Sequence, residues 1–258
     1  MNGIGCAGVF RRTSTCRLFV LFLLPVSLVL VISSAAHAWD KAAHRMITGH
    51  TLQILPGKMA PLLRQNEAAL FWGAVEPDFT RDDDHRLPVS FLRRASKPGV
   101  ADSALDKFAR SGEAMLQAGA KTGEIVFVLG QAAHFAQDLN LPLHAIRGDT
   151  REEHAAYEAA AFFLEWQPEK HSYAGFSSIS DYKCFAHEIA RRSHQFYKLA
   201  LQDPPPTHVI ETTWRDAIND TADVWQSIIS RALGPQKSLE LYGIPAPKSQ
   251  RGTGPSCR

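Results

Sequence analysis

The sequence predicts an all-α protein built as one multi-helix domain. Apolar residues recur at helical spacing through most of the chain after residue 38. Proline, glycine, asparagine or aspartate interrupts the pattern between the segments, as is typical of helix ends. No run between these interruptions shows the sustained period-two alternation of a half-buried β-strand, so the sequence offers no source for a sheet.

The first residues of the chain have the features of a secretory signal peptide at 1–38. Three arginines precede an apolar run at 18–32, and a small-residue Ala-His-Ala motif ends at residue 38. An uncleaved membrane anchor is the alternative, but the run is shorter than the roughly 20 residues that a bilayer span needs. We therefore expect a mature chain that begins at Trp39 and is exported, either to the periplasm or out of the cell.

Removal of this leader changes the charge of the chain. The loss of three arginines lowers Lys plus Arg from 28 to 25, while Asp plus Glu stays at 26. A chain so close to neutral excludes a nucleic-acid partner recruited by overall positive charge, and no stable nucleic-acid partner is expected. Cys184 and Cys257 remain in a compartment that permits a disulfide, and neither lies in a Cys-x-x-Cys pair.

The helical segments follow one another along a predicted domain at 39–233. Pro-Gly ends the first segment, and a loop at 73–87 with an acidic run follows the second. The fourth segment is apolar on nearly every side and ends at Asn-Leu-Pro. Polar sequence rich in Pro and Gly predicts a flexible C-terminal tail at 234–258. In chain order, the expected helices span 42–55, 60–72, 103–118, 125–138, 152–165, 179–201 and 208–233.

Two of these helices carry a histidine and a carboxylate at the same spacing. His134 and Asp138 lie four residues apart, hence on one face of their helix, and His154 and Glu158 repeat the spacing on the next helix. His144 lies in the bend between the two helices. One such pair alone is typical of a surface ion pair or of a satisfied core hydrogen bond.

The apolar surroundings of His134 and Asp138 favour a metal site. A buried imidazole and a buried carboxylate are costly unless they are paired or bind a metal. Imidazole nitrogen with carboxylate oxygen is a zinc ligand set, and the lack of nearby thiolates argues against a closed structural site. The sequence therefore predicts a zinc site with room for water.

The full ordered set of such residues resembles the trinuclear zinc site of the bacterial zinc-dependent phospholipases C. The same superfamily includes the fungal single-strand-specific zinc nucleases. As an ordered set the positions are highly specific, whereas any two of them would carry no weight. The positions are Trp39, His44, Asp78, His85, His134, Asp138, His144, His154 and Glu158.

The resemblance implies three zinc ions between the helices. An α-amine coordinates a metal only when it is free, so removal of the leader would complete the third site. The implied ligands are Asp78, His85, His134 and Asp138 for one ion, His144, His154 and Glu158 for the second, and His44, an oxygen of Asp138, and the amine and carbonyl oxygen of Trp39 for the third.

The chemistry of such a site fits hydrolysis of a phosphodiester. Closely spaced zinc ions lower the pKa of a shared water toward neutrality, which supplies hydroxide, and they clamp the phosphate oxygens. Asp78 is both an implied ligand and a neighbour of that water, and we take it as the candidate general base. The products would be a phosphomonoester and an alcohol.

The substrate stays open between two classes of phosphodiesterase. Glu158 as the last ligand and the short interval from His144 to His154 resemble the phospholipases, whereas Trp39-x4-His44 resembles the nucleases. The leading expectation is a phospholipase C that acts on a phospholipid or another phosphodiester, with transient contact to a membrane surface. The alternatives are a single-strand-specific nuclease or 3′-nucleotidase, and a zinc-binding protein without activity.

Overall fold

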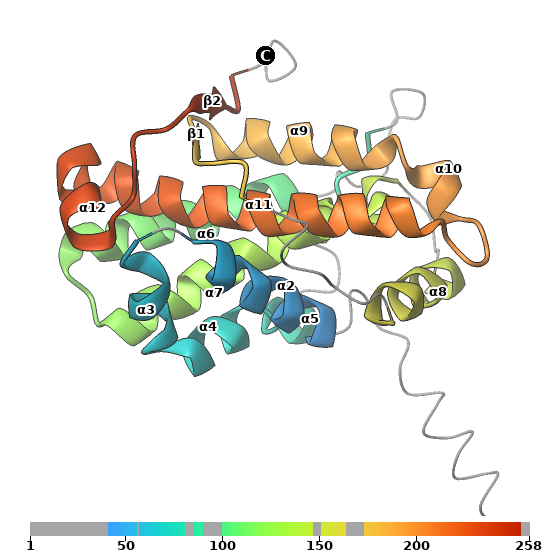
Figure 1. Cartoon of the computed structure of the whole chain (residues 1–258), viewed down its shortest axis with the longest axis horizontal. Helices are drawn as coiled ribbons and strands as arrows, with labels where there is room; N and C mark the ends of the chain where they lie inside the picture. The colour runs from blue at the N-terminus through green and yellow to red at the C-terminus, as the bar shows by residue number, and fades with distance from the viewer. Residues whose placement is uncertain are drawn as a thin grey trace, which may run out of the picture. The chain divides into compact units, whose positions relative to one another are not determined.

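Helices build the part of the chain that the structure describes, and the predicted all-α class is confirmed (Figure 1). The predicted signal peptide, Trp39 and Cys257 lie outside the described residues. The computed structural model describes residues 41–55, 57–80, 85–89, 100–146, 151–163 and 173–253. In chain order, its elements are α2 (Lys41–Ile54), α3 (Met59–Arg64), α4 (Glu67–Gly73), α5 (Pro77–Thr80), α6 (Ala101–Ala118), α7 (Thr122–Leu139), the 3-10 helix η1 (Pro142–Ala145), α8 (Arg151–Phe162), β1 (Ser177–Ile179), α9 (Tyr182–His194), α10 (Tyr197–Ala200), α11 (Thr207–Leu233), α12 (Pro235–Tyr242) and β2 (Ser249–Arg251).

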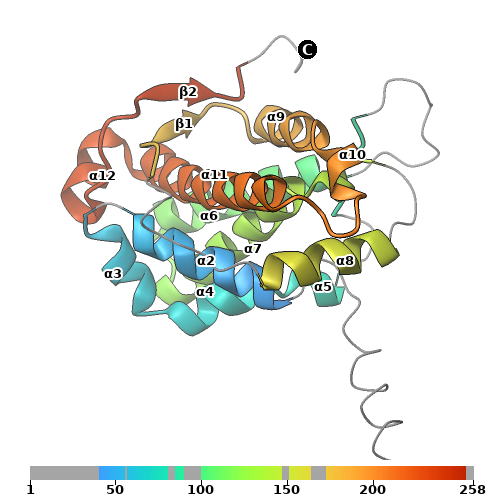
Figure 2. The ribbon, with the colours of Figure 1, turned by 45° about the vertical axis from the view of Figure 1, so that its right-hand side comes forward.

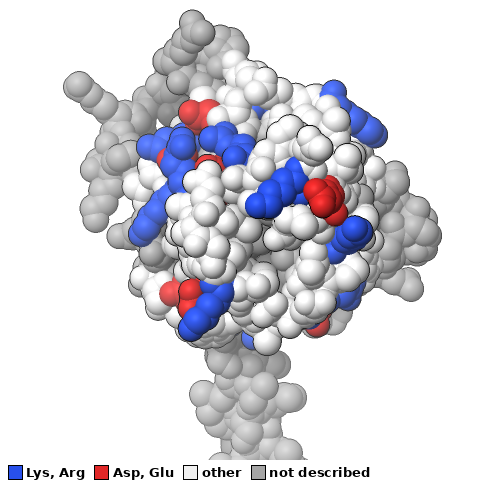
Figure 3. Space-filling view, turned by 90° about the vertical axis from the view of Figure 1, so that its left-hand side faces the viewer, with Lys and Arg blue, Asp and Glu red and all other residues white. Residues whose placement is uncertain are grey.

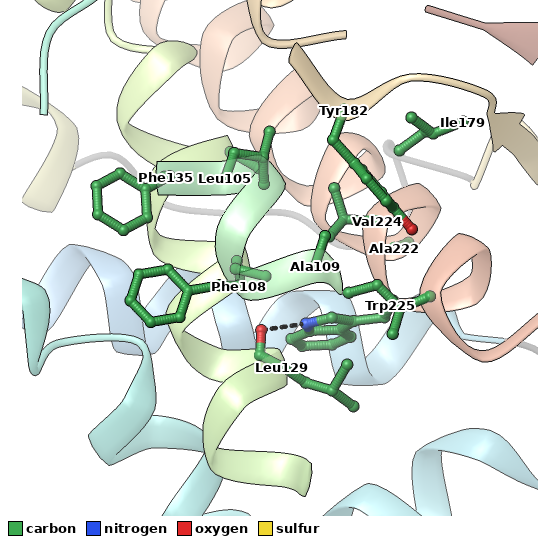
Figure 4. Packing of buried hydrophobic residues seen from close by; sticks show 14 of the residues in the cluster. Leu105, Phe108, Ala109, Leu129, Phe135, Ile179, Tyr182, Ala222, Val224 and Trp225 are labelled. Carbon is green, nitrogen blue, oxygen red and sulfur yellow. Dashed lines mark hydrogen bonds between the residues drawn. The ribbon is translucent and has the colours of Figure 1, made fainter. Parts of the chain in front are cut away.

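Helix α7 forms the centre of the core. From Ile125 onward almost every side chain of α7 is buried, as expected for a helix that is apolar on all sides. Helices α4, α6, α9 and α11 pack around it. The indole N–H of Trp225, on α11, donates to the carbonyl oxygen of Leu129, on α7, at 2.9 Å (Figure 4). This hydrogen bond links α11 to α7 within the core.

A second buried cluster places α2, η1 and α8 against the first half of α11 (Figure 2). Ala43 and Ile47 of α2 meet Tyr157 and Ala161 of α8 in this cluster. The hydroxyl groups of Tyr157 and Thr213 are hydrogen-bonded at 2.7 Å, so the one polar atom of this tyrosine is satisfied although the ring is buried. Because α2 and α8 carry candidate site residues, this packing determines where those residues lie.

The structure divides two of the predicted helices. The helix expected at 60–72 is two helices, α3 and α4, because Asn66 has a φ of −125°, outside the helical range. The helix expected at 179–201 begins only at Tyr182, where the side chain of Asp181 accepts from the backbone N–H of Cys184 at 2.9 Å. A turn then separates α9 from α10.

The segment after Gly234 differs from the weakly ordered tail that its composition predicts. It forms α12 and β2, and β2 pairs in parallel with β1 through the register Ser177 to Ser249. The sequence predicts no sheet because no segment alternates with period two, and strands of three residues are too short to show such alternation. Among the described residues, no helix combines the length and the apolar content needed to cross a bilayer. Cys184 is disulfide-bonded, and its partner lies outside the described residues.

Arg251 anchors this C-terminal segment in a cluster of acidic side chains. Its guanidinium lies 2.6 Å from Asp220, 2.8 Å from Glu188 and 3.4 Å from Asp223. Asp220 is buried and also pairs with Arg192. These partners are far from Arg251 in sequence, which is why the composition of the segment does not reveal the contact.

Asp223 is expected to make folding stability depend on pH. Burial raises the pKa of Asp223 to about 7, and the charge of Asp220 adds to the rise. The folded state therefore favours the protonated acid, and this stabilisation is present below the unfolded pKa near 4 and is lost as the pH rises through 7. In Asp223→Asn, the amide oxygen can still accept from Ser177 N–H and the Tyr173 hydroxyl.

We expect the free energy of unfolding of Asp223→Asn, measured relative to that of the wild type, to rise by up to about 4 kcal/mol as the pH increases from 4 to 7.5. Urea unfolding of both proteins across this range, at one fixed zinc concentration, measures the difference. Parallel profiles for the two proteins would show that Asp223 is ionised at neutral pH in the folded state.

Candidate metal centre

The candidate metal centre is built on the last two turns of α7. His134 and Asp138 lie one helical turn apart, both fully buried, with 3.2 Å between Nε2 and Oδ2. Helix α7 ends directly after them, and the side-chain amide of Asn140 donates to the Ala136 carbonyl oxygen at 2.9 Å. The same amide donates to Asp220 at 2.8 Å. These bonds hold the end of the helix that carries the site.

Two glycines let α4 approach α7 closely enough to complete one side of the centre. A Cβ on Gly73 would lie 2.0 Å from the Phe127 carbonyl oxygen, and a Cβ on Gly130 would lie 2.3 Å from the Leu70 carbonyl oxygen. The close contact brings the carbonyl oxygen of Ala74 to 2.9 Å from Nδ1 of His134. Since that nitrogen must donate, Nε2 of His134 keeps its lone pair for the centre.

The short helix α5 follows this contact and presents Asp78. The Asp78 carboxylate lies 3.8 Å from Nε2 of His134 and 4.0 Å from Nε2 of His44. Asp78 is half-buried, and burial raises its pKa. The loop expected at 73–87 thus contains one helical turn at the point where a candidate ligand occurs.

Helix α2 contributes His44. Its Nδ1 donates to the side-chain oxygen of Gln137 at 2.7 Å, and the amide of Gln137 in turn donates to Thr48 at 3.1 Å. Nε2 of His44 is thereby directed at Asp138, at 3.3 Å. The rings of His44 and His134 stack with their centroids 4.2 Å apart.

His85 closes the first group of ligands. Its Nδ1 lies 2.7 Å from Oδ2 of Asp138 and 2.9 Å from Nε2 of His134. The residues that follow it are held by backbone hydrogen bonds to η1, from Leu87 N–H to the His144 carbonyl oxygen at 3.0 Å and from Val89 N–H to the Ala145 carbonyl oxygen at 3.0 Å. His85 and His144 are therefore positioned together.

His144 and α8 form the neighbouring group. The rings of His144 and His154 lie 5.0 Å apart, and Glu158 follows His154 by one turn on α8. His154 is hydrogen-bonded to the backbone of Leu143, beside His144. Nδ1 of His144 lies 3.8 Å from Oδ2 of Asp138, so this carboxylate connects the two groups.

The nitrogen and oxygen atoms of this cluster are suited to bind a metal ion, because several of them make no hydrogen bond to one another. Several buried ligand-type atoms make no hydrogen bond within the described part of the chain, and burial of such atoms without partners is costly. These atoms are Nε2 of His44, Oδ2 of Asp78, Oδ1 of Asp138, Nδ1 of His144 and Nε2 of His154. Two tight groups have all their ligand atoms within 4.8 Å of one another, namely His44, His134 and Asp138, and Asp78, His85 and His134. Nitrogen and carboxylate oxygen are zinc ligands.

The ionisation states suit metal binding as well. Burial lowers the pKa of His134 and of His144, and burial together with the charge of Arg86 lowers the pKa of His154 to about 4. Burial alone would raise the pKa of Asp138, but the imidazoles around it hold that pKa well below its usual range. Neutral imidazoles around an ionised carboxylate are the protonation states that metal ligands require.

His44 departs from this pattern for a reason that also favours a cation. Burial lowers the pKa of His44, yet the close and negatively charged carboxylates of Asp138 and Asp78 outweigh burial and raise that pKa. The carboxylates therefore attract a positive charge to the space between these side chains. A metal ion satisfies the same attraction without a proton on His44.

The structure thus links seven of the nine positions named from the sequence in one cluster, and Glu158 follows His154 by one turn of α8. Trp39 lies outside the described residues. Sequence reasoning missed Gln137, which orients His44, and the Ala74 carbonyl group, which orients His134. A signal for Gln137 exists, because it is a polar residue on a helix that is mostly apolar. A backbone carbonyl group has no sequence signal.

These observations define a helical protein with a buried imidazole and carboxylate centre of the type that binds zinc. The sequence profile described as zinc dependent phospholipase C matches residues 43–227. The chain therefore belongs to the zinc-dependent phospholipase C family, a family of phosphodiester hydrolases.

Solved structures show the same fold. The alpha toxin from Clostridium absonum has a TM-score of 0.54 and 16% identity, and the match covers 74% of this chain and 63% of the toxin. The Clostridium perfringens alpha-toxin from avian strain SWCP has a TM-score of 0.52 and 17% identity, and the match covers 78% of this chain and 64% of the toxin. The chain thus spans less than two thirds of the length of either toxin. A comparison with curated proteins found no match.

A methyl group at Gly130 is expected to disturb the centre from a distance. In Gly130→Ala, the Cβ would lie 2.3 Å from the Leu70 carbonyl oxygen, so α4 must move, and we expect a loss of about 1–3 kcal/mol in stability. Because the movement also displaces the Ala74 carbonyl group from His134, zinc affinity should fall. Chemical unfolding and competition with a chelator measure the two effects.

Gly123→Ala provides the matched control in the first turn of the same helix. A Cβ there meets the side chain of Asn66 at 3.4 Å, which is an ordinary contact. This variant should keep its zinc affinity and its stability, since alanine favours a helix more than glycine does. If the two variants behave alike, the close contact of α4 with α7 does not hold the centre.

Proposed function

We propose that the mature chain is an exported zinc-dependent phosphodiester hydrolase of the phospholipase C type. The observation that carries this proposal is the cluster of buried ligand-type atoms around Asp138 that make no hydrogen bond within the described residues. Membership of the family supplies the class of reaction and, because the family acts on phospholipids, the class of substrate.

The proposed ligands divide among three zinc ions. Zinc bound in such a centre lowers the pKa of a water molecule and offsets the charge of the phosphate oxygens. The proposed sets are Asp78, His85, His134 and Asp138, then His144, His154 and Glu158, and finally His44, an oxygen of Asp138 and the N-terminal residue Trp39.

Asp78 is the proposed general base. Its Oδ2 atom makes no hydrogen bond within the described residues, although it is buried, so it can accept a proton from the attacking water. Burial raises the pKa of this carboxyl group, which makes it a stronger base than a solvated aspartate. The adjacent imidazoles of His44 and His134 keep it oriented toward the centre.

Export belongs to this proposal through the first residue of the mature chain. The sequence at 1–38 has the order of a signal peptide, and its removal would free the amine of Trp39 for coordination. The destination is the periplasm or the outside of the cell. A phospholipid substrate then implies transient contact with a membrane surface.

A substrate panel tests the proposal. Protein that comprises residues 39–258 and is loaded with zinc is expected to release phosphocholine or another phosphomonoester from phospholipids and to lose this activity on chelation. Denatured DNA and 3′-nucleotides are assayed in parallel. Hydrolysis of nucleic acid in place of lipid, or zinc binding without turnover on any phosphodiester, would contradict the proposal.

Two asparagine variants serve as controls for the roles of the carboxylates. Asp78→Asn should lower kcat at least about 100-fold through loss of the base, with most of the zinc retained. Asp138→Asn removes the charge shared by both ligand groups and should lose zinc as well as activity. Equal loss of zinc and turnover in the two variants would remove the separate role of Asp78.

A further inference from the structure

Exposed aromatic rings are concentrated beside the metal centre. Among the described residues, the exposed large hydrophobic side chains include four aromatic ones, Trp72 at 48%, Phe79 at 53%, Phe162 at 55% and Phe163 at 83% exposure. The other exposed large side chains are leucines. Since neighbouring exposed rings are unfavourable in water, such a group marks a surface that contacts something else.

The four rings form two pairs, each close in sequence to a candidate ligand. The ring of Trp72, in the last turn of α4, lies 5.5 Å from the ring of Phe79, which follows Asp78 on α5. Phe162 ends α8, the helix of His154 and Glu158, and its ring lies 5.6 Å from that of Phe163. We call these four side chains the aromatic rim.

The start of α2 connects the two pairs. The ammonium group of Lys41 lies 3.8 Å from the centre of the Phe79 ring. Ala43, two residues later, lies in the same buried cluster as Ala161, next to Phe162. In both ribbon views α2, α5 and α8 lie side by side (Figures 1 and 2). The aromatic rim therefore lies on one side of the molecule.

Basic side chains accompany the aromatic rim. Lys41 and Arg45 are both exposed and lie one turn apart on α2, hence on one face of it. The exposed acids of α8, Glu152 and Glu153, lie in its first turn, about 15 Å from Phe162 at 1.5 Å per residue. Aromatic rings with nearby lysine and arginine are the composition of surfaces that sit at the level of lipid headgroups.

We propose that the aromatic rim, with Lys41 and Arg45, docks the enzyme onto a phospholipid bilayer. The rings of Phe162 and Phe163 enter the boundary between headgroups and acyl chains, and the two basic groups contact lipid phosphates. This inference rests on the proposed function, because docking there brings the phosphodiester level of the bilayer to the side where the ligand-bearing elements end.

The opposite end of the molecule offers a competing surface. Helix α12 lies there, and it carries the exposed leucines Leu239 and Leu241. Figure 3 shows that lysine and arginine side chains are scattered over this face with fewer acidic ones. If general charge attraction or any exposed apolar side chain were sufficient for binding, this face would serve equally well.

Binding to vesicles tests the inference independently of turnover. The mature zinc-loaded protein is prepared in the Asp78→Asn background, so that the vesicles stay intact, and mixed with vesicles of phosphatidylcholine and phosphatidylglycerol. We expect the double variant Phe162→Ser with Phe163→Ser to have a vesicle partition coefficient at least about tenfold lower than that of the parent. The matched control, Leu239→Ser with Leu241→Ser on α12, should bind as the parent does.

A charge-reversal variant tests the role of the two basic side chains, and hydrolysis rates on two substrates test whether the catalytic site stays intact. Lys41→Glu with Arg45→Glu should weaken binding most at low salt, because screening already weakens the parent at high salt. In a protein that keeps Asp78, the Phe162→Ser and Phe163→Ser double variant should hydrolyse a water-soluble short-chain phosphodiester at the wild-type rate. It should hydrolyse the lipids of vesicles more slowly than the wild type does. A slower rate on both substrates would assign these rings to the catalytic site instead and overturn the docking role.

The outcomes separate this inference from the proposed function. Vesicle binding that depends on Phe162 and Phe163 in a protein that cleaves no lipid would support the aromatic rim and contradict the phospholipase assignment. Lipid cleavage by the wild type, with unchanged vesicle binding in that double variant, would support the phospholipase assignment and contradict the docking role of the aromatic rim. Self-association that depends on the two rings, seen by sedimentation in the absence of vesicles, would show that a second copy covers the rim and would also overturn the inference.

Discussion

The structure depends on one constraint, the burial of an ionised carboxylate at the C-terminal end of its central helix. Asp138 is fully buried on α7, and the imidazoles of His134 and His144 hold its pKa well below the usual range. A charge in such a place is stable only while its partners remain, since removal of one partner of a buried ionic group typically costs about 3–5 kcal/mol. The surrounding helices must therefore converge on this carboxylate, and the proposed zinc ions would balance its charge.

The convergence is produced by packing features that are themselves outside the centre. Close contact at Gly73 and Gly130 brings α4 and then α5 to α7, and Gln137 orients His44 on α2. At the end of α7, Asn140 joins the helix to Asp220, which also receives Arg251 from β2. The last strand of the chain is thus linked through buried polar contacts to the helix that carries the candidate ligands.

The sequence predicts the parts of this arrangement that local spacing controls. The repeat of four residues places His134 with Asp138 and His154 with Glu158, and apolar periodicity finds α2, α6, α7, α8 and α11. It cannot predict backbone contacts between helices, such as the one at Gly130, because a glycine inside a helix has the same local pattern with or without a neighbour. It also cannot predict Arg251, whose acidic partners lie far away in sequence. The convergence of His44, Asp78 and His85 on α7 came from the resemblance rather than from spacing.

Anomalous diffraction at the zinc edge from crystals of the mature protein would show whether zinc binds around Asp138. We expect zinc peaks within coordination distance of Asp138, His134 and His144, with Nδ1 of His134 still hydrogen-bonded to the carbonyl oxygen of Ala74. Zinc bound only at other side chains, with the buried imidazoles paired to one another around a protonated Asp138, would contradict it.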